Sequence, residues 1–181
     1  MGILYGILGL AAVIGIWGVL LYNRFITLGK MREEGWSGVL VQLKRRHDLV
    51  PNLVNAVKGY MTHEKSVLED LTKTRATQGT AAQVAASENQ FTQTLSRLFA
   101  LAENYPDLKA STNFLSLQES LQDIEDEVQL ARRYYNGTVR DYNILVESFP
   151  SLIVARMFGF RQADFFELED AKEAAVPQVS F

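Results

Sequence analysis

The chain has 181 residues, of which 48% are hydrophobic and 22% charged, and its formal net charge is -3. This composition excludes a wholly disordered chain, and the absence of cysteine excludes disulfides, thiolate metal sites and a cysteine nucleophile. A net negative charge is not typical of a nucleic-acid binder, so we expect no nucleic-acid partner.

The first predicted element is an apolar run, Ile3–Tyr22, which holds 20 residues without a charge. Every charged side chain lies at or beyond Arg24. A helix of 20 residues rises about 30 Å, which is the thickness of the bilayer hydrocarbon. A cleaved signal peptide fits less well, because the run is too long and no basic residue precedes it. We therefore predict a transmembrane anchor over residues 1–23, with the lipid bilayer as its surroundings.

The residues around this span predict its orientation. Arg24, Lys30 and Arg32 follow the span, and no charged side chain precedes it. The positive-inside rule then places a short N-terminus outside and the body in the cytoplasm, as a single-pass protein. Small residues four positions apart form a candidate membrane-span packing face. They are Gly2, Gly6, Ala11 and Gly15.

Beyond the span, apolar residues recur at steps of four and three, a period typical of helices that pack along a heptad seam, as in a coiled coil. The first seam reads Trp36, Leu40, Leu43, His47, Val50, Val54, Val57, Met61, Glu64, Leu68 and Leu71. The second reads Val84, Glu88, Phe91, Leu95, Leu98, Ala102 and Tyr105. The third reads Phe114, Leu117, Leu121, Ile124, Val128, Ala131, Tyr135, Thr138, Tyr142 and Leu145.

Four local signals predict where these helices begin and end. Gly79 is a stop signal, and Thr80 with Gln83 has the form of a capping box that opens the second helix. Pro106 ends that helix, and the segment Ser148–Pro150 breaks the third. We therefore expect helices over residues 23–78, 81–105, about 111–147 and 151–168.

No stretch shows the alternation of a strand, so the predicted fold is all-α. An N-terminal transmembrane helix continues into an antiparallel bundle of three long helices and one short helix. The body covers residues 24–168, and residues 169–181 form a frayed acidic tail. The first helix would exceed about 80 Å and the second only about 40 Å, so part of the first would be uncovered. Trp36, Leu40 and Leu43 would then need partners: neighbouring copies, the membrane surface, the fourth helix or another protein.

The sequence carries no pattern of a known catalytic or metal site. His63 and Glu64 open a zinc-protease signature, but position 67 is Val67 where a second histidine is required. His47 and His63 are about 24 Å apart along one helix and cannot share a metal. We expect no enzyme, no catalytic residue, no metal, no cofactor and no small-molecule substrate.

A dense polar cluster on the first helix is a candidate interface. It consists of Lys44, Arg45, Arg46, His47, Asp48 and Pro51. One interpretation is a solvated face on a helix bent by Pro51, with His47 on the seam beside a polar partner. The other is a docking surface for anionic lipid or for an acidic neighbour. The acidic run Asp123, Glu125, Asp126 and Glu127 is one such neighbour.

Phenylalanines are concentrated in the fourth segment, where five of the ten occur. They are Phe149, Phe158, Phe160, Phe165 and Phe166. These rings either cap the bundle core or form an interface with a partner or a second copy. Arg156 and Arg161 leave direct lipid contact open as a third interpretation.

Three segments in order resemble the LemA family: 42–59 (QLKRRHDLVPNLVNAVKG), 104–114 (NYPDLKASTNF) and 131–143 (ARRYYNGTVRDYN). The resemblance continues into the fourth segment at Phe149, Pro150, Phe158, Gly159, Phe160, Phe165 and Phe166. It implies a protein of the bacterial cell (inner) membrane with a helical-bundle body, and it offers no catalytic residues to carry over. The resemblance also implies two associations. Genes of family members often lie beside a gene for a membrane metalloprotease, and proteins of a related branch belong to magnetosome membranes.

Two functional hypotheses follow. The first is a non-enzymatic scaffold that forms a homo-oligomer through its helical body and organises a patch of bacterial membrane. The alternative is an adaptor or regulator that binds another membrane protein, such as a membrane metalloprotease.

Overall fold

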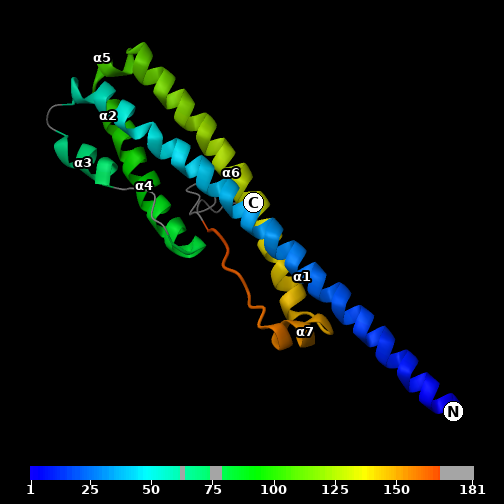
Figure 1. The fold of residues 1–181 in the computed structure, drawn as a ribbon. Coiled ribbons are helices and arrows are strands. Elements are labelled where there is room, and N and C mark those ends of the chain that lie inside the picture. Colours follow the sequence, from blue (N-terminus) through cyan, green and yellow to red (C-terminus); the bar gives the residue numbers. More distant parts are fainter. Residues whose placement is uncertain (62–63, 74–78, 168–181) are drawn as a thin grey trace, which may run out of the picture. The chain divides into compact units, whose positions relative to one another are not determined.

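The computed structural model describes residues 1–61, 64–73 and 79–167, in which the regular elements are helices and no strand occurs (Figure 1). The helices are α1 (Gly2–Asp48), α2 (Val50–Lys58), α3 (Lys65–Lys73), α4 (Ala81–Ala102), α5 (Pro106–Lys109), α6 (Thr112–Glu147) and α7 (Ser151–Phe158). The predicted all-α class is confirmed. The predicted tail lies outside the described residues.

The described chain forms two compact units. The anchor unit comprises Met1–Gly38 and Arg133–Ala163. The core unit comprises Val39–Arg132 together with the described residues from Asp164 onward. Helices α1 and α6 each contribute residues to both units. The first and third seams predicted from the sequence are therefore divided between two hydrophobic cores.

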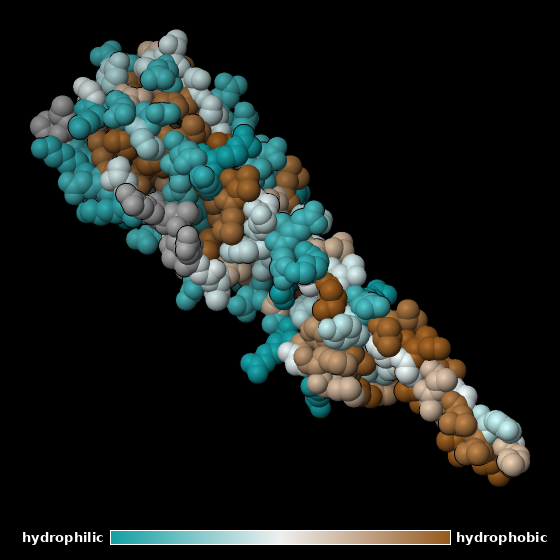
Figure 2. All heavy atoms as spheres, in the orientation of Figure 1, coloured by the Kyte–Doolittle hydropathy of each residue, from teal (hydrophilic) through white to brown (hydrophobic). Residues whose placement is uncertain are grey.

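The anchor unit begins with the predicted span, which is part of α1 and has no buried residue in its most apolar window. The apolar side chains of this part of α1 cover its surface in Figure 2. Hydrocarbon is the solvent in which such a surface is stable, because it exposes no unpaired polar group. After the span, Phe25 packs with Tyr142, Val146, Val154 and Ala155 from α6 and α7.

The core unit buries most of the second seam and the third seam as far as Val128, whereas the third seam from Tyr135 onward belongs to the anchor unit. Buried side chains of α2, α3, α4, α5 and α6 form one continuous cluster. Its fully buried members are Leu53, Val57, Leu71, Phe91, Leu98 and Leu108. Helix α3 contacts both α2 and α4. Burial of this apolar surface is the main force that holds the short helices together.

The prediction of one unbroken helix over residues 23–78 is wrong. Helix α1 ends at Asp48 and α2 begins at Val50, with Pro51 in its first turn. Proline has no N–H to donate to residue 47, and its ring crowds that carbonyl, so the hydrogen-bond pattern is interrupted at Leu49, within the segment where a bend was expected, although the Leu49 backbone stays helical. A second interruption follows α2 at Gly59, a residue that costs about 1 kcal/mol in a helix. Helix α1 has 47 residues and α4 has 22, so the expected difference in length remains. Side chains of α6 and α7 pack on the part of α1 that follows the span.

The other boundaries are closer to the predictions. The capping box of Thr80 and Gln83 is present and opens α4. Helix α4 ends at Ala102, three residues before the predicted end, and Pro106 begins the short helix α5. Helix α6 begins and ends where expected, whereas α7 stops at Phe158, ten residues early. Gly159 ends α7 with φ of 75°, a backbone conformation that favours glycine.

Candidate functional site

The small residues predicted as a membrane-span packing face are exposed in the described structure. Gly2, Gly6, Ala11 and Gly15 have no cover from the chain, and a Cβ at any of the three glycines would have no neighbour within 4 Å. The structure leaves this face available, and its use for helix association stays a prediction.

Two of the three residues expected to lack partners have them within the chain. The Trp36 ring lies 5.2 Å from that of Tyr135 on α6. Gly35 allows this close approach, since a Cβ there would lie 3.2 Å from the Tyr135 backbone. Leu43 is only 1% exposed, because it faces the core unit, as does Val39. Leu40 alone remains 39% exposed, so the expectation of an uncovered seam at Trp36 and Leu43 is wrong.

Two residues of the predicted polar cluster belong to a buried group, which we call the charge cluster: Arg46 and His47 of α1, Glu88 and Thr92 of α4, and Glu125 of α6. His47 Nε2 lies 2.7 Å from Glu88 Oε1. Arg46 Nη2 lies 2.9 Å from Glu125 Oε2, and Nη1 lies 3.6 Å from Glu88 Oε2. His47 thus has the polar partner expected of a seam histidine, and Glu125 of the acidic run is an ion-pair partner within the same chain.

Two members of the charge cluster, Arg46 and Glu88, are removed from water, whereas the side chains of His47 and Glu125 are 13% and 28% exposed. The side chain of Glu88 is 0% exposed and that of Arg46 is 3% exposed. Arg46 also donates to the Thr92 hydroxyl at 3.1 Å, and its guanidinium lies 4.9 Å from the centre of the Phe91 ring. Because these charges are buried, Arg46 is not part of a solvated docking face, and the cluster links α1, α4 and α6 inside the core unit.

The remaining members of the polar cluster lie on the surface. Lys44, Arg45, Asp48 and Pro51 are exposed, and Arg45 donates to the Gln42 side chain at 3.0 Å. Nearer the span, a hydrogen bond from Lys30, together with its charge, lowers the pKa of the Glu33 carboxyl. These contacts are those of a solvated helix face, and they identify no ligand.

The phenylalanines of the fourth segment have different environments. Phe166 is fully buried, and Phe160 is half-buried and stacked on Phe25 at 4.5 Å. Phe149, Phe158 and Phe165 are 81%, 55% and 39% exposed. Phe160 and Phe166 therefore pack inside the chain, whereas an interface or lipid contact stays a prediction for the three exposed rings.

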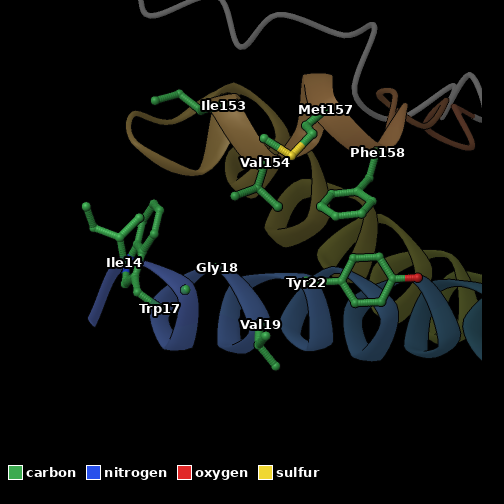
Figure 3. Close-up of a pocket in the computed structure, with 10 residues that line it drawn as sticks. Ile14, Trp17, Gly18, Val19, Tyr22, Ile153, Val154, Met157 and Phe158 are labelled. Atoms are coloured by element: carbon green, nitrogen blue, oxygen red, sulfur yellow. The ribbon is translucent and has the colours of Figure 1, made fainter. Parts of the chain in front are cut away.

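Sequence analysis missed one feature, an apolar groove between the span and α7 (Figure 3). The spacing of apolar residues along the sequence did not reveal this groove, since α7 lies against a segment more than 130 positions earlier in the chain. Among the described residues no group of three metal-binding side chains occurs. The arrangement offers interaction surfaces, and we build the function on these.

Comparison with known proteins bears on the family directly. The model of the LemA family matches residues 35–181, which is most of the chain. The chain belongs to the LemA family. The resemblance found in the sequence is therefore confirmed.

Magnetosome proteins are among the relatives of this LemA-family chain. Magnetosome proteins MamQ 1 and MamQ 2 of Paramagnetospirillum magneticum are each 23% identical to it over 185 residues, which cover 86% of this chain and 68% of theirs. Magnetosome protein MamQ of Magnetospirillum gryphiswaldense is 22% identical over 189 residues, covering 87% of this chain and 70% of its own. Together with the apolar N-terminal helix, these relatives support a membrane-associated protein.

Proposed function

We propose that this LemA-family chain is a non-enzymatic scaffold of the bacterial inner membrane, with its body in the cytoplasm. Copies anchored by their spans assemble through their helical bodies and organise a patch of membrane. The similarity to magnetosome proteins and the absence of catalytic motifs in the sequence support this class of function.

One observation carries the proposal. On the α1 segment of the core unit, Leu40 and Val41 are 39% and 53% exposed, although both are large apolar side chains on a well-formed helix. Arg46 and His47 of the same helix have their partners within the chain and are not available for contact between copies. Since 39% and 53% of these side chains are still accessible, burying the rest between copies contributes about 2 kcal/mol, roughly thirtyfold in an association constant. Leu40 and Val41 are therefore the residues that we assign to contact between copies.

Replacing Leu40 and Val41 together with aspartate is expected to dissociate the assembly. Charges placed in an apolar contact lose hydration without gaining partners. The measurement is light scattering of full-length protein after gentle extraction, with the detergent mass subtracted. We expect the wild-type protein to form one size class far above 20.4 kDa. At equal concentration, we expect the dissociation constant of the double variant to be at least tenfold larger.

The double variant Leu115→Asp with Leu130→Asp is the matched control, since it adds the same two charges at leucines that are 48% and 53% exposed on α6. Leu43 is unsuitable for this test because its side chain is buried, and aspartate there would unfold the core unit. A monomeric wild-type protein, or an assembly that the Leu40 and Val41 changes leave intact, would contradict the proposal. A monomeric wild-type protein would favour the alternative hypothesis, an adaptor that binds another membrane protein.

A further inference from the structure

The groove between the span and α7 has a volume of about 450 Å³, within the range of about 300–1,000 Å³ that is common for ligand sites. Its wall is made of apolar side chains and glycine from two helices of the anchor unit. From α1 these are Ile14, Gly15, Trp17, Gly18, Val19 and Tyr22, and from α7 they are Ile153, Val154, Met157 and Phe158. In Figure 3, Ile153 lies over the Ile14 end of the groove and Phe158 lies over Tyr22.

Helix α7 is held in this place by specific contacts. Val154 and Ala155 are buried in the core that includes Phe25. The Phe158 ring lies 4.9 Å from the Tyr22 ring. After α7, the amide of Asn143 donates to the Ala163 carbonyl at 2.9 Å, and the Ala163 N–H donates to Asn143 Oδ1 at 2.8 Å. The groove is therefore part of the folded anchor unit.

The groove lies alongside the last part of the predicted span. Tyr22 ends the uncharged run. Aromatic residues are common at this position, because it lies at the membrane–water interface. In Figure 3, the Tyr22 hydroxyl points along α1, away from Ile14. Ile14 is eight positions earlier, about 12 Å deeper in the hydrocarbon. If the span crosses the bilayer, α7 must then lie in the leaflet on the side of the body. Its outer residues suit that solvent, since Ile153 and Met157 are 52% and 71% exposed.

We propose that this groove binds one acyl chain of a membrane phospholipid, from the leaflet in which α7 lies. The two exposed cations of this segment, Arg156 and Arg161, are suited to the anionic phosphate, because long side chains extend to the headgroup level from an apolar helix. The proposal rests on the membrane anchor of the proposed function, but it does not require self-assembly.

A single acyl chain fits the groove better than a neighbouring helix does. A helix is a stiff rod about 10 Å across, so it would need matching side chains along a groove only about 12 Å long, whereas an acyl chain can bend to follow the groove. An acyl chain is one row of methylene groups, and it makes no demand for hydrogen bonds that this apolar wall could not meet. The shape and chemistry of the groove therefore favour lipid over a second span.

Filling the groove with leucine tests the proposal. A Cβ at Gly18, in the groove, and a Cβ at Gly9, outside it, both meet nothing within 4 Å, so Gly18→Leu and Gly9→Leu are matched changes on one helix. Full-length protein is released from vesicles of phosphatidylethanolamine and phosphatidylglycerol, and native mass spectrometry counts the phospholipids on each chain. We expect one retained phospholipid on the wild-type and Gly9→Leu proteins, and at least a fivefold smaller lipid-bound fraction for Gly18→Leu. Equal retention by all three proteins, or equal loss from both variants, would overturn the proposal.

The depth of α7 gives an independent measurement. The chain has no cysteine, so Met157→Cys and the control Ser116→Cys, on the exposed surface of α6, each carry a single spin label without other changes. In vesicles, we expect oxygen to relax the label at position 157 more strongly than a water-soluble nickel chelate does, and the reverse at position 116. A label at 157 as accessible to nickel as the control would place α7 in water and reject lipid binding. Both readouts are obtained per chain, so they hold even if the self-assembly of the proposed function fails.

Discussion

The variant Glu88→Gln is expected to lower the free energy of unfolding by about 3 kcal/mol. Glu88 has no exposed surface and faces both Arg46 and His47, at 3.6 Å and 2.7 Å. Glutamine has nearly the same size but no charge, so the buried guanidinium keeps only Glu125 as an ion-pair partner. Chemical denaturation of the full-length protein in detergent, followed by circular dichroism, measures the effect.

Two further variants decide whether charge is the cause. Glu119→Gln makes the same substitution at an exposed position of α6 and should change stability by less than about 0.5 kcal/mol. The double variant Arg46→Met with Glu88→Leu removes the two most buried charges together and should recover part of the loss, since apolar residues replace buried ions at little cost while the partly exposed His47 and Glu125 lose their partners. If Glu88→Gln is as stable as Glu119→Gln, the charge cluster does not stabilise the core unit.

The variant Phe25→Ala should destabilise the anchor unit by about 3–5 kcal/mol, the usual cost of deleting a buried phenylalanine ring. Phe25 is 1% exposed, stacks on Phe160 at 4.5 Å and meets the Tyr142 ring edge-on at 6.2 Å. These contacts hold α7 beside α1, so their loss should expose the α7 backbone to solvent. Amide hydrogen exchange of α7 in detergent micelles measures this opening.

Phe149→Ala is the matched control, because Phe149 is 81% exposed and makes no part of the anchor-unit core. We expect its α7 exchange rates to equal those of the wild-type protein. Unchanged exchange in Phe25→Ala would show that α7 stays in place without this ring, and it would weaken the account of the groove given above.

The sequence alone determined the fold class, the apolar N-terminal helix, the course of α4 and α6 and the family. These follow from local rules: an uncharged run long enough for a bilayer, apolar residues at helical period, and the capping box at Thr80. The family resemblance came from segments that run from Gln42 to Phe166 in order, which the match over residues 35–181 confirms. The sequence also indicated that His47 needs a polar partner, because a seam position is shielded from water.

Only the tertiary structure decided which charges are inside. Arg45 and Arg46 are neighbours of the same type, yet one is exposed and the other is 3% exposed, since the buried face of α1 passes through Val39, Leu43 and Arg46. Sequence period placed Leu40 on that face, but the buried register continues through Val50 and Leu53, so Val39 takes the place expected for Leu40. The groove beside the span depends on residues far apart in the chain. Local sequence carries no signal for such contacts, because they form only when α7 packs against α1.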